Sequence, residues 1–333
     1  MVLRQFRHPE RSRKETELLS RTHDRTLIEQ RELMVMITLH EYLETCACAD
    51  GLASLIELIA EQAVPIRDAF ITHQSYATSI NVSGEQQAAM DTWSDAHLTE
   101  VYRYSELVKV LASEEQNEII NFPDATSNYA IVMDPLDGSS LIQTNLAVGT
   151  IVGIFDNGKV MQKGSNQKAA LYMIYGPMTT LTLTVGEGVA IFAMDEQKEY
   201  ILLDGEVKMP EGNLYASGGL KKDWTDKHAR FIDTVEHKGF KLRYSGSFVA
   251  DFHQVLKYGG FYCYPALEGK PEGKLRLLFE AYPIGFIAAQ AGGAISDGGR
   301  SLLEVEPTSL HQRTPIYVGS RGVIELMEGI LSG

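Results

Sequence analysis

The sequence is short of cysteine, of long apolar runs and of positive charge, and each shortage excludes a class of protein. Three cysteines in 333 residues are too few for the disulfide framework of a secreted domain. No stretch reaches the roughly 18 consecutive apolar residues that a membrane-spanning helix needs. Because the formal net charge is -14, nucleic acid and anionic membrane surfaces are poor partners, and any anionic substrate would need cations to hold it.

The cysteines and the first residues also lack the patterns of redox motifs and targeting peptides. Cys46 and Cys48 are one residue apart, which is not the spacing of a redox or zinc motif, so we interpret them as small apolar residues at a helix end. The stretch "MVLRQFRHPERSRKE" is arginine-rich but contains acids, and it has no apolar core. We therefore expect residues 1–26 to form a mobile N-terminal arm and the protein to be cytoplasmic.

Apolar periodicity predicts a helix-rich start, a run of strands and then alternating elements. Helical spacing covers residues 27–63 and 86–111, and the polar stretch 72–85 is expected to be a loop. Strands are predicted at 129–133, 148–155, 169–175, 180–186, 189–194 and 200–203. From about residue 223 helices and strands alternate, which is typical of a layered α/β unit. The length favours two fused α/β subdomains, 27–200 and 201–333.

The segment "DPLDGSS" at 134–140 follows the predicted strand 129–133. Pro135 fixes its own φ and favours an extended Asp134, so we expect the strand to end at Asp134. Asp134 and Asp137 can then converge on one point, with the carbonyl of Leu136 between them.

The three small residues after Asp137 are suited to an anion. Gly138 permits a tight backbone, and the N–H groups of Gly138, Ser139 and Ser140 can then point outward as an anion cradle. Carboxylates for a hard cation beside a cradle for phosphate are typical of metal-assisted phosphoryl transfer.

Other acids also stand next to apolar runs or at the predicted helix 86–111. They are Glu114 and Glu115 after 108–112, Glu280 after 277–279, and Glu85 and Asp91 around the helix start. Two carboxylates about 5 Å apart repel by roughly 3 kcal/mol at an effective dielectric of about 20, so several such pairs would cancel the stability of a domain. The acids are therefore either dispersed on the surface or gathered by divalent cations. Singly, each has an ordinary interpretation as a solvated, capping or turn residue, but ends of strands are where α/β active sites form.

Several motifs together resemble the class I fructose-1,6-bisphosphatase family, within the lithium-sensitive metal-dependent phosphatases. The motifs are "SEE" at 113–115, "DPLDGSS" at 134–140, "VGTI" at 148–151, "GSFVADFHQ" at 246–254, "KLRLLFE" at 274–280 and "HQR" at 311–313. The resemblance implies a fold, an αβαβα layered sandwich, that is usually assembled as homodimers or homotetramers.

The resemblance also implies roles for the acids. The family's metal ligands match Glu114, Glu115, Asp134, the Leu136 carbonyl, Asp137 and Glu280. Asp91 matches the acid that orients the attacking water together with the glutamates and contributes to the metal site, and Glu85 stands where the family has a loop aspartate. The implied cofactor is Mg²⁺, two or three ions per site, with Mn²⁺ as a substitute, because all the ligands are oxygens.

The implied substrate contacts are spread over both halves of the chain. The 1-phosphate is expected on the amides of residues 138–140, and Lys274 and Arg276 lie on one face of a strand. Arg243 resembles a residue that reaches into the neighbouring subunit's site and binds the distal phosphate. Tyr244, Gly246, Ser247 and Tyr264 complete the implied set.

The motifs divide over which sugar is bound. "SGGL" at 217–220 replaces Asn-Glu-Gly-Asn/Tyr of the fructose enzyme and resembles "SPGNL" of sedoheptulose-1,7-bisphosphatases, as does "IYGPMTT" at 174–180. "GSFVADFHQ" and "YPA" at 264–266 resemble the fructose enzyme. We therefore expect hydrolysis of sedoheptulose 1,7-bisphosphate to sedoheptulose 7-phosphate, with fructose 1,6-bisphosphate as the alternative.

Two remoter alternatives are an inositol monophosphatase-type enzyme and a catalytically silent metabolite-binding protein. The first usually has Trp-Asp where this chain has Phe279-Glu280, and the second would be expected to have lost part of the acidic set. Asn128 and Asp156 replace a Lys and an Arg of the family's AMP site, so AMP control is not expected.

Overall fold

The computed structural model describes residues 36–46, 48–73, 76–80 and 86–333, and Thr38–Gly333 form one compact unit. The predicted arm 1–26 and the acid Glu85 lie outside the described residues. None of the described helices combines the length and the apolar character needed to cross a bilayer. The predicted subdomain boundary near residue 200 stays a prediction.

The larger sheet has eight strands in the order β10-β9-β8-β7-β6-β5-β3-β4. Its neighbours are antiparallel except for the parallel pair β3 and β5. The strands are β3 (Val108–Ser113), β4 (Ile120–Asn121), β5 (Tyr129–Asp137), β6 (Val148–Phe155), β7 (Ala169–Tyr175), β8 (Thr179–Thr184), β9 (Ala190–Met194) and β10 (Tyr200–Asp204). A separate antiparallel pair joins β1 (Tyr76–Ile80) to β2 (Gln86–Ala88).

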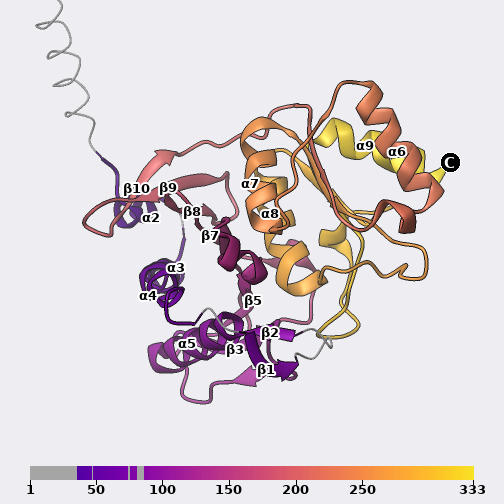
Figure 1. Ribbon diagram of the computed structural model, residues 1–333. Helices are drawn as coiled ribbons and strands as arrows, with labels where there is room; N and C mark the ends of the chain where they lie inside the picture. The colour runs from indigo at the N-terminus through magenta and orange to yellow at the C-terminus, as the bar shows by residue number, and fades with distance from the viewer. Residues whose placement is uncertain (1–35, 47, 74–75, 81–85) are drawn as a thin grey trace, which may run out of the picture. The chain divides into compact units, whose positions relative to one another are not determined.

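Four helices cover one face of this sheet (Figure 1). They are α2 (Leu39–Thr45), α3 (Asp50–Glu61), α4 (Ala63–Ala69) and α5 (Ala89–Ser105). Thr38 and Glu41 form a capping box that starts α2. The stripe Leu52, Leu55 and Ile56 buries one side of α3, as its helical spacing predicts.

The opposite face of the sheet packs on α7 (Phe248–Tyr258) and α8 (Tyr282–Gln290). Side chains alternate along β5: Ala130 and Val132 face this central layer, whereas Ile131 and Met133 face α2–α5. Because sheets lie on both sides of it, α8 is apolar nearly all round, with seven of its nine residues buried.

The smaller sheet has five strands in the order β12-β11-β13-β15-β14 and is covered on its far side by α6 (Asp226–His237) and α9 (Arg321–Ser332). The strands are β11 (Leu214–Ser217), β12 (Lys241–Leu242), β13 (Gly260–Tyr264), β14 (Ala294–Ser296) and β15 (Ile316–Gly319). The short turns are 3₁₀ helices η1 (Ser139–Thr144), η2 (Gly164–Asn166), η3 (Lys221–Asp223) and η5 (Leu302–Glu304), and the π-helical η4 (Leu277–Ala281). Helices, sheet, helices, sheet and helices follow one another, which confirms the predicted αβαβα sandwich (Figure 1).

Three local predictions are wrong. The helix expected over 86–111 ends at Ser105, because Glu106 takes a left-handed φ of 57°. Strand β3 then begins at Val108. Strand β1 lies inside the loop expected at 72–85. The strand expected to stop at Asp134 continues to Asp137, since its register against β6 shifts between Asp134 and Asp137 and the irregularity accommodates the proline.

Candidate active site

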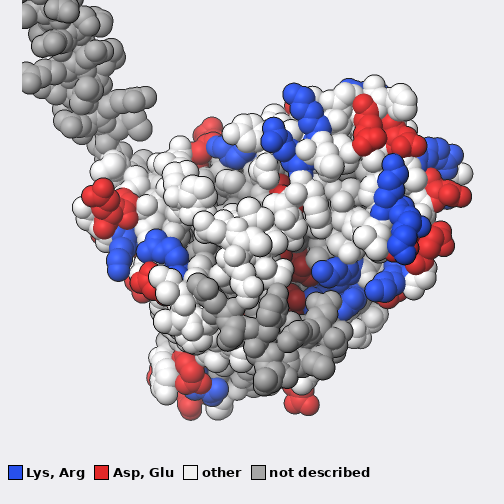
Figure 2. Space-filling model, viewed as in Figure 1, with Lys and Arg blue, Asp and Glu red and all other residues white. Residues whose placement is uncertain are grey.

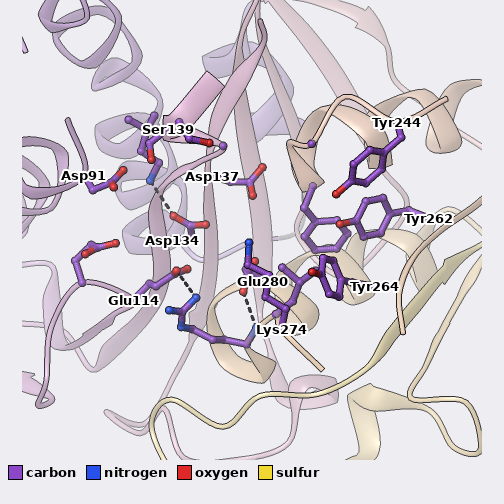
Figure 3. A pocket seen from close by; sticks show the side chains of 18 residues that line it. Asp91, Glu114, Asp134, Asp137, Ser139, Tyr244, Tyr262, Tyr264, Lys274 and Glu280 are labelled. Atoms are coloured by element: carbon purple, nitrogen blue, oxygen red, sulfur yellow. Dashed lines mark hydrogen bonds and ion pairs between the residues drawn. The ribbon is translucent and has the colours of Figure 1, made fainter. Parts of the chain in front are cut away.

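One pocket of about 200 Å³ collects most of the predicted site residues (Figure 3). Asp91, Glu114 and Asp134 lie on one side of it and three tyrosines lie on the other, with Glu280 and Lys274 between them. In the space-filling view, acidic side chains are visible inside a hollow beside basic ones (Figure 2). The pocket is lined by Asp91, Glu114, Glu115, Asp134, Leu136, Asp137, Gly138, Ser139, Ser140, Tyr244, Gly246, Phe248, Tyr262, Tyr264, Lys274, Leu275, Arg276 and Glu280.

The irregular end of β5 places two aspartates in the pocket. The backbone N–H of Leu136 donates to Asp134 Oδ1 at 2.9 Å, and Thr150 Oγ1 donates to the carbonyl of Pro135 at 2.9 Å. These bonds hold the irregular segment of β5, and Asp134 and Asp137 are only 6% and 8% exposed.

Asp137 is also bound by the start of α7. Ser247 Oγ and the backbone N–H of Val249 each donate to Asp137 Oδ2 at 2.8 Å. Burial raises the pKa of Asp137 to about 6, although these two hydrogen bonds act in the opposite direction. Ser247 therefore acts on the site through Asp137, and it is itself buried.

Glu280 enters the pocket from the π-helical turn η4, in which the N–H of Ala281 donates to the carbonyl of Arg276. The N–H of Arg276 donates to Glu280 Oε2 at 2.6 Å, and the Arg276 guanidinium forms an ion pair with Glu114. Burial and the neighbouring Glu114 raise the pKa values of Asp134 and Glu280 well above their usual range.

The acids fit a hard divalent cation. One carboxylate oxygen from each of Glu114, Asp134 and Glu280 lies within 4.8 Å of the other two. Glu114 Oε2 is buried and has no hydrogen-bond partner among the described residues, so it is a ligand atom still to be satisfied. All the groups are oxygens, which suits Mg²⁺ or Mn²⁺ better than zinc.

Residues 138–140 line the same pocket just after β5. Gly138 has φ +81°, and a Cβ there would lie 2.8 Å from the Cβ of Ser247, so both the backbone conformation and the close approach require glycine. η1 begins at Ser139, and the first N–H groups of a helix have no intrahelical acceptor. The turn is therefore suited to an anion beside the carboxylates.

The later part of the chain supplies an aromatic wall, with Tyr262 and Tyr264 on β13, and a cation, Lys274. Lys274 lies in a bend, so the strand expected to carry Lys274 and Arg276 is not formed there. In Figure 3 the rings of Tyr244, Tyr262 and Tyr264 face the acids across the pocket. Lys274 Nζ lies 5.9 Å from the centre of the Tyr264 ring. A Cβ on Gly218 would lie 2.3 Å from Cδ2 of Tyr264, so the ring packs directly on the glycine backbone.

Of the predicted site residues that the structure describes, two do not line the pocket. Ser247 is buried behind Asp137, Arg243 is exposed, and Glu85 lies outside the described residues. The sequence interpretation missed Phe248, Leu275 and Tyr262. Tyr262 precedes Tyr264 by two residues on β13, and this period-two spacing could have revealed that both rings share a face.

Two family models match the chain. The model "Fructose-1-6-bisphosphatase, N-terminal domain" matches residues 38–204, and "Fructose-1-6-bisphosphatase, C-terminal domain" matches residues 209–332. A class 1 fructose-1,6-bisphosphatase of Methanocorpusculum labreanum is 56% identical over 295 residues, covering 89% of this chain and 92% of that relative. A second, from Methanospirillum hungatei, is 53% identical over 298 residues and covers 89% and 96%.

Solved structures agree with the sequence relatives. The fructose-1,6-bisphosphatase of Leishmania major in holo form matches with a TM-score of 0.85 and 32% identity, covering 90% of this chain and 100% of that chain. None of these matches supports the sedoheptulose-1,7-bisphosphatase-like branch that the sequence motifs favoured. The chain belongs to the class 1 fructose-1,6-bisphosphatase family and is a phosphoric monoester hydrolase of the sugar-bisphosphatase kind.

Proposed function

We propose that the protein hydrolyses the 1-phosphate of fructose 1,6-bisphosphate with the help of Mg²⁺. The observation that carries the proposal is the group of three carboxylates within 4.8 Å of one another, in a pocket that also contains Lys274 and Arg276. The relatives described above are named fructose-1,6-bisphosphatases, so this sugar replaces sedoheptulose 1,7-bisphosphate as the main expectation.

The acids would hold the cation. Glu114, Asp134 and Glu280 would bind it, with Asp137 and the Leu136 carbonyl as further oxygen ligands. Bound Mg²⁺ supplies a Lewis acid for the phosphoryl oxygens and lowers the pKa of water.

Two acids remain for the attacking water. Asp91, from the first turn of α5, and Glu115 line the pocket next to the proposed ligand set. We assign both carboxylates to accept hydrogen bonds from the water. These bonds would align the water for attack, and one of the carboxylates would receive its proton. The water oxygen would bond to phosphorus while the bond between phosphorus and the C1 oxygen breaks, and that oxygen would take up a proton, so inorganic phosphate and fructose 6-phosphate are released.

The remaining groups would bind the substrate. The N–H groups of residues 138–140 would hold the 1-phosphate, and Lys274 and Arg276 would offset its charge. Tyr244 and Tyr264, with Gly246 at the rim, would contact the sugar. The positive charges and the cation together let a chain of net charge -14 bind an anion.

We further propose a homodimer or homotetramer in which Arg243 binds the distal phosphate in the neighbouring subunit. Arg243 is exposed beside the edge strand β12 and does not line the pocket of its own chain. Mixed oligomers of Asp134→Asn and Arg243→Ala subunits test this. The Arg243→Ala subunit keeps its metal ligands and receives Arg243 from its neighbour, so mixing should restore turnover at low substrate, and no gain on mixing would contradict it.

The substrate is tested by measuring phosphate release from fructose 1,6-bisphosphate and sedoheptulose 1,7-bisphosphate side by side, with Mg²⁺ and with EDTA. We expect a higher kcat/KM for the fructose compound and no turnover in EDTA. A higher kcat/KM for the sedoheptulose compound would restore the sequence-based preference. Turnover unaffected by EDTA would refute the metal site.

A further inference from the structure

A buried carboxylate that does not line the pocket lies directly behind the Glu114–Glu115 pair. Asp95 is on α5, one helical turn after Asp91, and is only 3% exposed. Burying a carboxylate is costly unless hydrogen bonds compensate for lost water, so such a residue requires a reason. Burial raises the pKa of Asp95, and its hydrogen bonds to Ser113 and Gln116 act in the opposite direction.

Both oxygens of Asp95 bind the residues that flank the two glutamates. Ser113 Oγ donates to Oδ1 at 2.5 Å, and Gln116 Nε2 donates to Oδ2. The N–H of Glu115 in turn donates to Ser113 Oγ at 3.3 Å. One side chain therefore ties down both ends of the turn that presents Glu114 and Glu115 to the pocket.

The same turn is held from the opposite side by the "HQR" segment. His311 Nε2 donates to the carbonyl of Gln116 at 2.8 Å. The ring of His311 lies 5.4 Å from that of Phe279, the residue before Glu280. Gln116 thus connects Asp95 on one side with the turn that carries Glu280 on the other.

We propose that Asp95 is a positioning residue that holds Glu114 and Glu115 in the geometry needed to bind a divalent cation. The inference rests on the proposed metal site. Within the described part of the chain, Asp95 does not line the pocket, and its hydrogen bonds are to Ser113 and Gln116. Hydrogen-bonded residues behind metal ligands orient them, and their loss typically weakens metal binding roughly 10–100-fold.

The test compares Asp95→Ala with Asp95→Asn. Mn²⁺ binding is measured by electron paramagnetic resonance of the free ion, and Mg²⁺ activation and steady-state kinetics are measured on fructose 1,6-bisphosphate. Asp95→Ala should weaken Mn²⁺ binding roughly 10–100-fold and raise the Mg²⁺ concentration for half-activation in parallel. The KM for the sugar bisphosphate at saturating Mg²⁺ should change little, which separates positioning from a general loss of fold.

Asp95→Asn should rescue binding. Asn Oδ1 accepts from Ser113, and Asn Nδ2 donates to Gln116 once that amide turns over. Ser94→Ala is the matched control, because Ser94 is buried on the same helix and its hydroxyl has no hydrogen-bond partner among the described residues. We expect Ser94→Ala to bind Mn²⁺ as the wild type does.

Mn²⁺ binding at the wild-type level by folded Asp95→Ala would overturn the proposal. An Asp95→Asn variant that binds Mn²⁺ as weakly as Asp95→Ala would also overturn it, because the charge of Asp95 and not its hydrogen-bonding geometry would then matter. If Asp95→Ala does not fold, Gln116→Ala removes one of the two contacts at a partly exposed position and must weaken Mn²⁺ binding in the same direction. If the wild type binds Mn²⁺ but does not hydrolyse the sugar bisphosphate, the proposed function fails while the Mn²⁺ comparison still decides the role of Asp95.

Discussion

The two sheet regions contribute opposite charges to one pocket. From the eight-stranded region, 38–204, come the acids at the end of β5 and the Glu114–Glu115 turn, with Asp91 from α5. From the later region, 209–332, come Lys274, Arg276 and the tyrosine wall, and Glu280 is the one acid it adds to the pocket lining. Neither region alone holds the full set of acids, cations and tyrosines, so the complete pocket forms only where the two meet.

The regions also differ in their buried titratable groups. In the first, burial raises the pKa values of Asp134 and Asp137. In the second, burial lowers the pKa values of His228 and His253 to about 4. His228 is hydrogen-bonded to Ser217 Oγ at 3.1 Å and Tyr317 OH at 3.0 Å, and burial lowers its pKa. The pocket carboxylates are therefore stabilised by protons or cations, whereas the two buried histidines are stabilised in their neutral form.

The largest effect should come from removing one acid of the first region. Asp134→Asn should lower kcat at least about 10³-fold, because a metal ion contributes several kcal/mol to the transition state and each 1.36 kcal/mol is a factor of ten. Metal-free Asp134→Asn should unfold at the same temperature as the wild type or higher, since it relieves the repulsion from Glu114 and Asp137. Phosphate release and thermal unfolding in EDTA measure the two effects.

Asp124→Asn is the matched control, because Asp124 is exposed and does not line the pocket. It should leave both kcat and the unfolding temperature unchanged. An active Asp134→Asn enzyme would contradict the assignment of the site, and a lower unfolding temperature in EDTA would contradict the repulsion.

The next effect is a pH dependence of stability that has opposite signs for two buried groups, Asp137 in the first region and His228 in the later one. The folded pKa of Asp137, about 6, is above its unfolded value, so its contribution is fully present below about pH 4 and is lost as the pH rises through 6. The folded pKa of His228, about 4, is below its unfolded value, so its contribution is present above about pH 6.5 and is lost as the pH falls through 4. Each amounts to about 3 kcal/mol, at 1.36 kcal/mol per pKa unit.

Urea unfolding of the metal-free protein between pH 4 and 8 measures both effects. Mg²⁺ should restore stability at pH 8 and have little effect at pH 4, where the carboxylates are protonated. His228→Gln, which retains hydrogen-bonding groups but cannot ionise, should flatten the acid side of the profile and leave the Mg²⁺ effect at pH 8 intact. An equal Mg²⁺ effect at both pH values would contradict the difference between the regions.

The smallest effect should come from a cation of the later region. Lys274→Ala removes one charge-assisted hydrogen bond to substrate, worth roughly 1.5–3 kcal/mol, so KM should rise at least about tenfold with little change in kcat. Lys270→Ala, at an exposed lysine outside the pocket lining, should leave KM unchanged. Steady-state kinetics of the two variants measure this difference. A fall in kcat at constant KM for Lys274→Ala would instead mean that Lys274 stabilises the transition state rather than the bound substrate.

Local patterns in the sequence predicted much of the fold. The short, mostly apolar runs of β6 and β7 gave their observed bounds, and the stripe on α3 was found because its period is 3.6 residues. The failures have local causes of a different kind. β3 was assigned to the preceding helix because its residues are apolar and follow a helical run without a proline or glycine. β5 was cut short because a proline normally ends an interior strand, whereas here an irregular register tolerates it.

By itself, the sequence determined which residues could carry the chemistry: an acidic set adjoining apolar runs, the glycine after Asp137 that permits a turn, and Lys274 and Arg276 on alternate positions. Such features depend on residue type and short spacing. Only the tertiary structure decided that Glu114, Asp134 and Glu280 meet, that Tyr262 joins the wall, and that Asp95 lies behind the glutamates. Glu114 and Glu280 are separated by more of the chain than any local period spans, so their distance is set by how the layers pack and not by the residues between them.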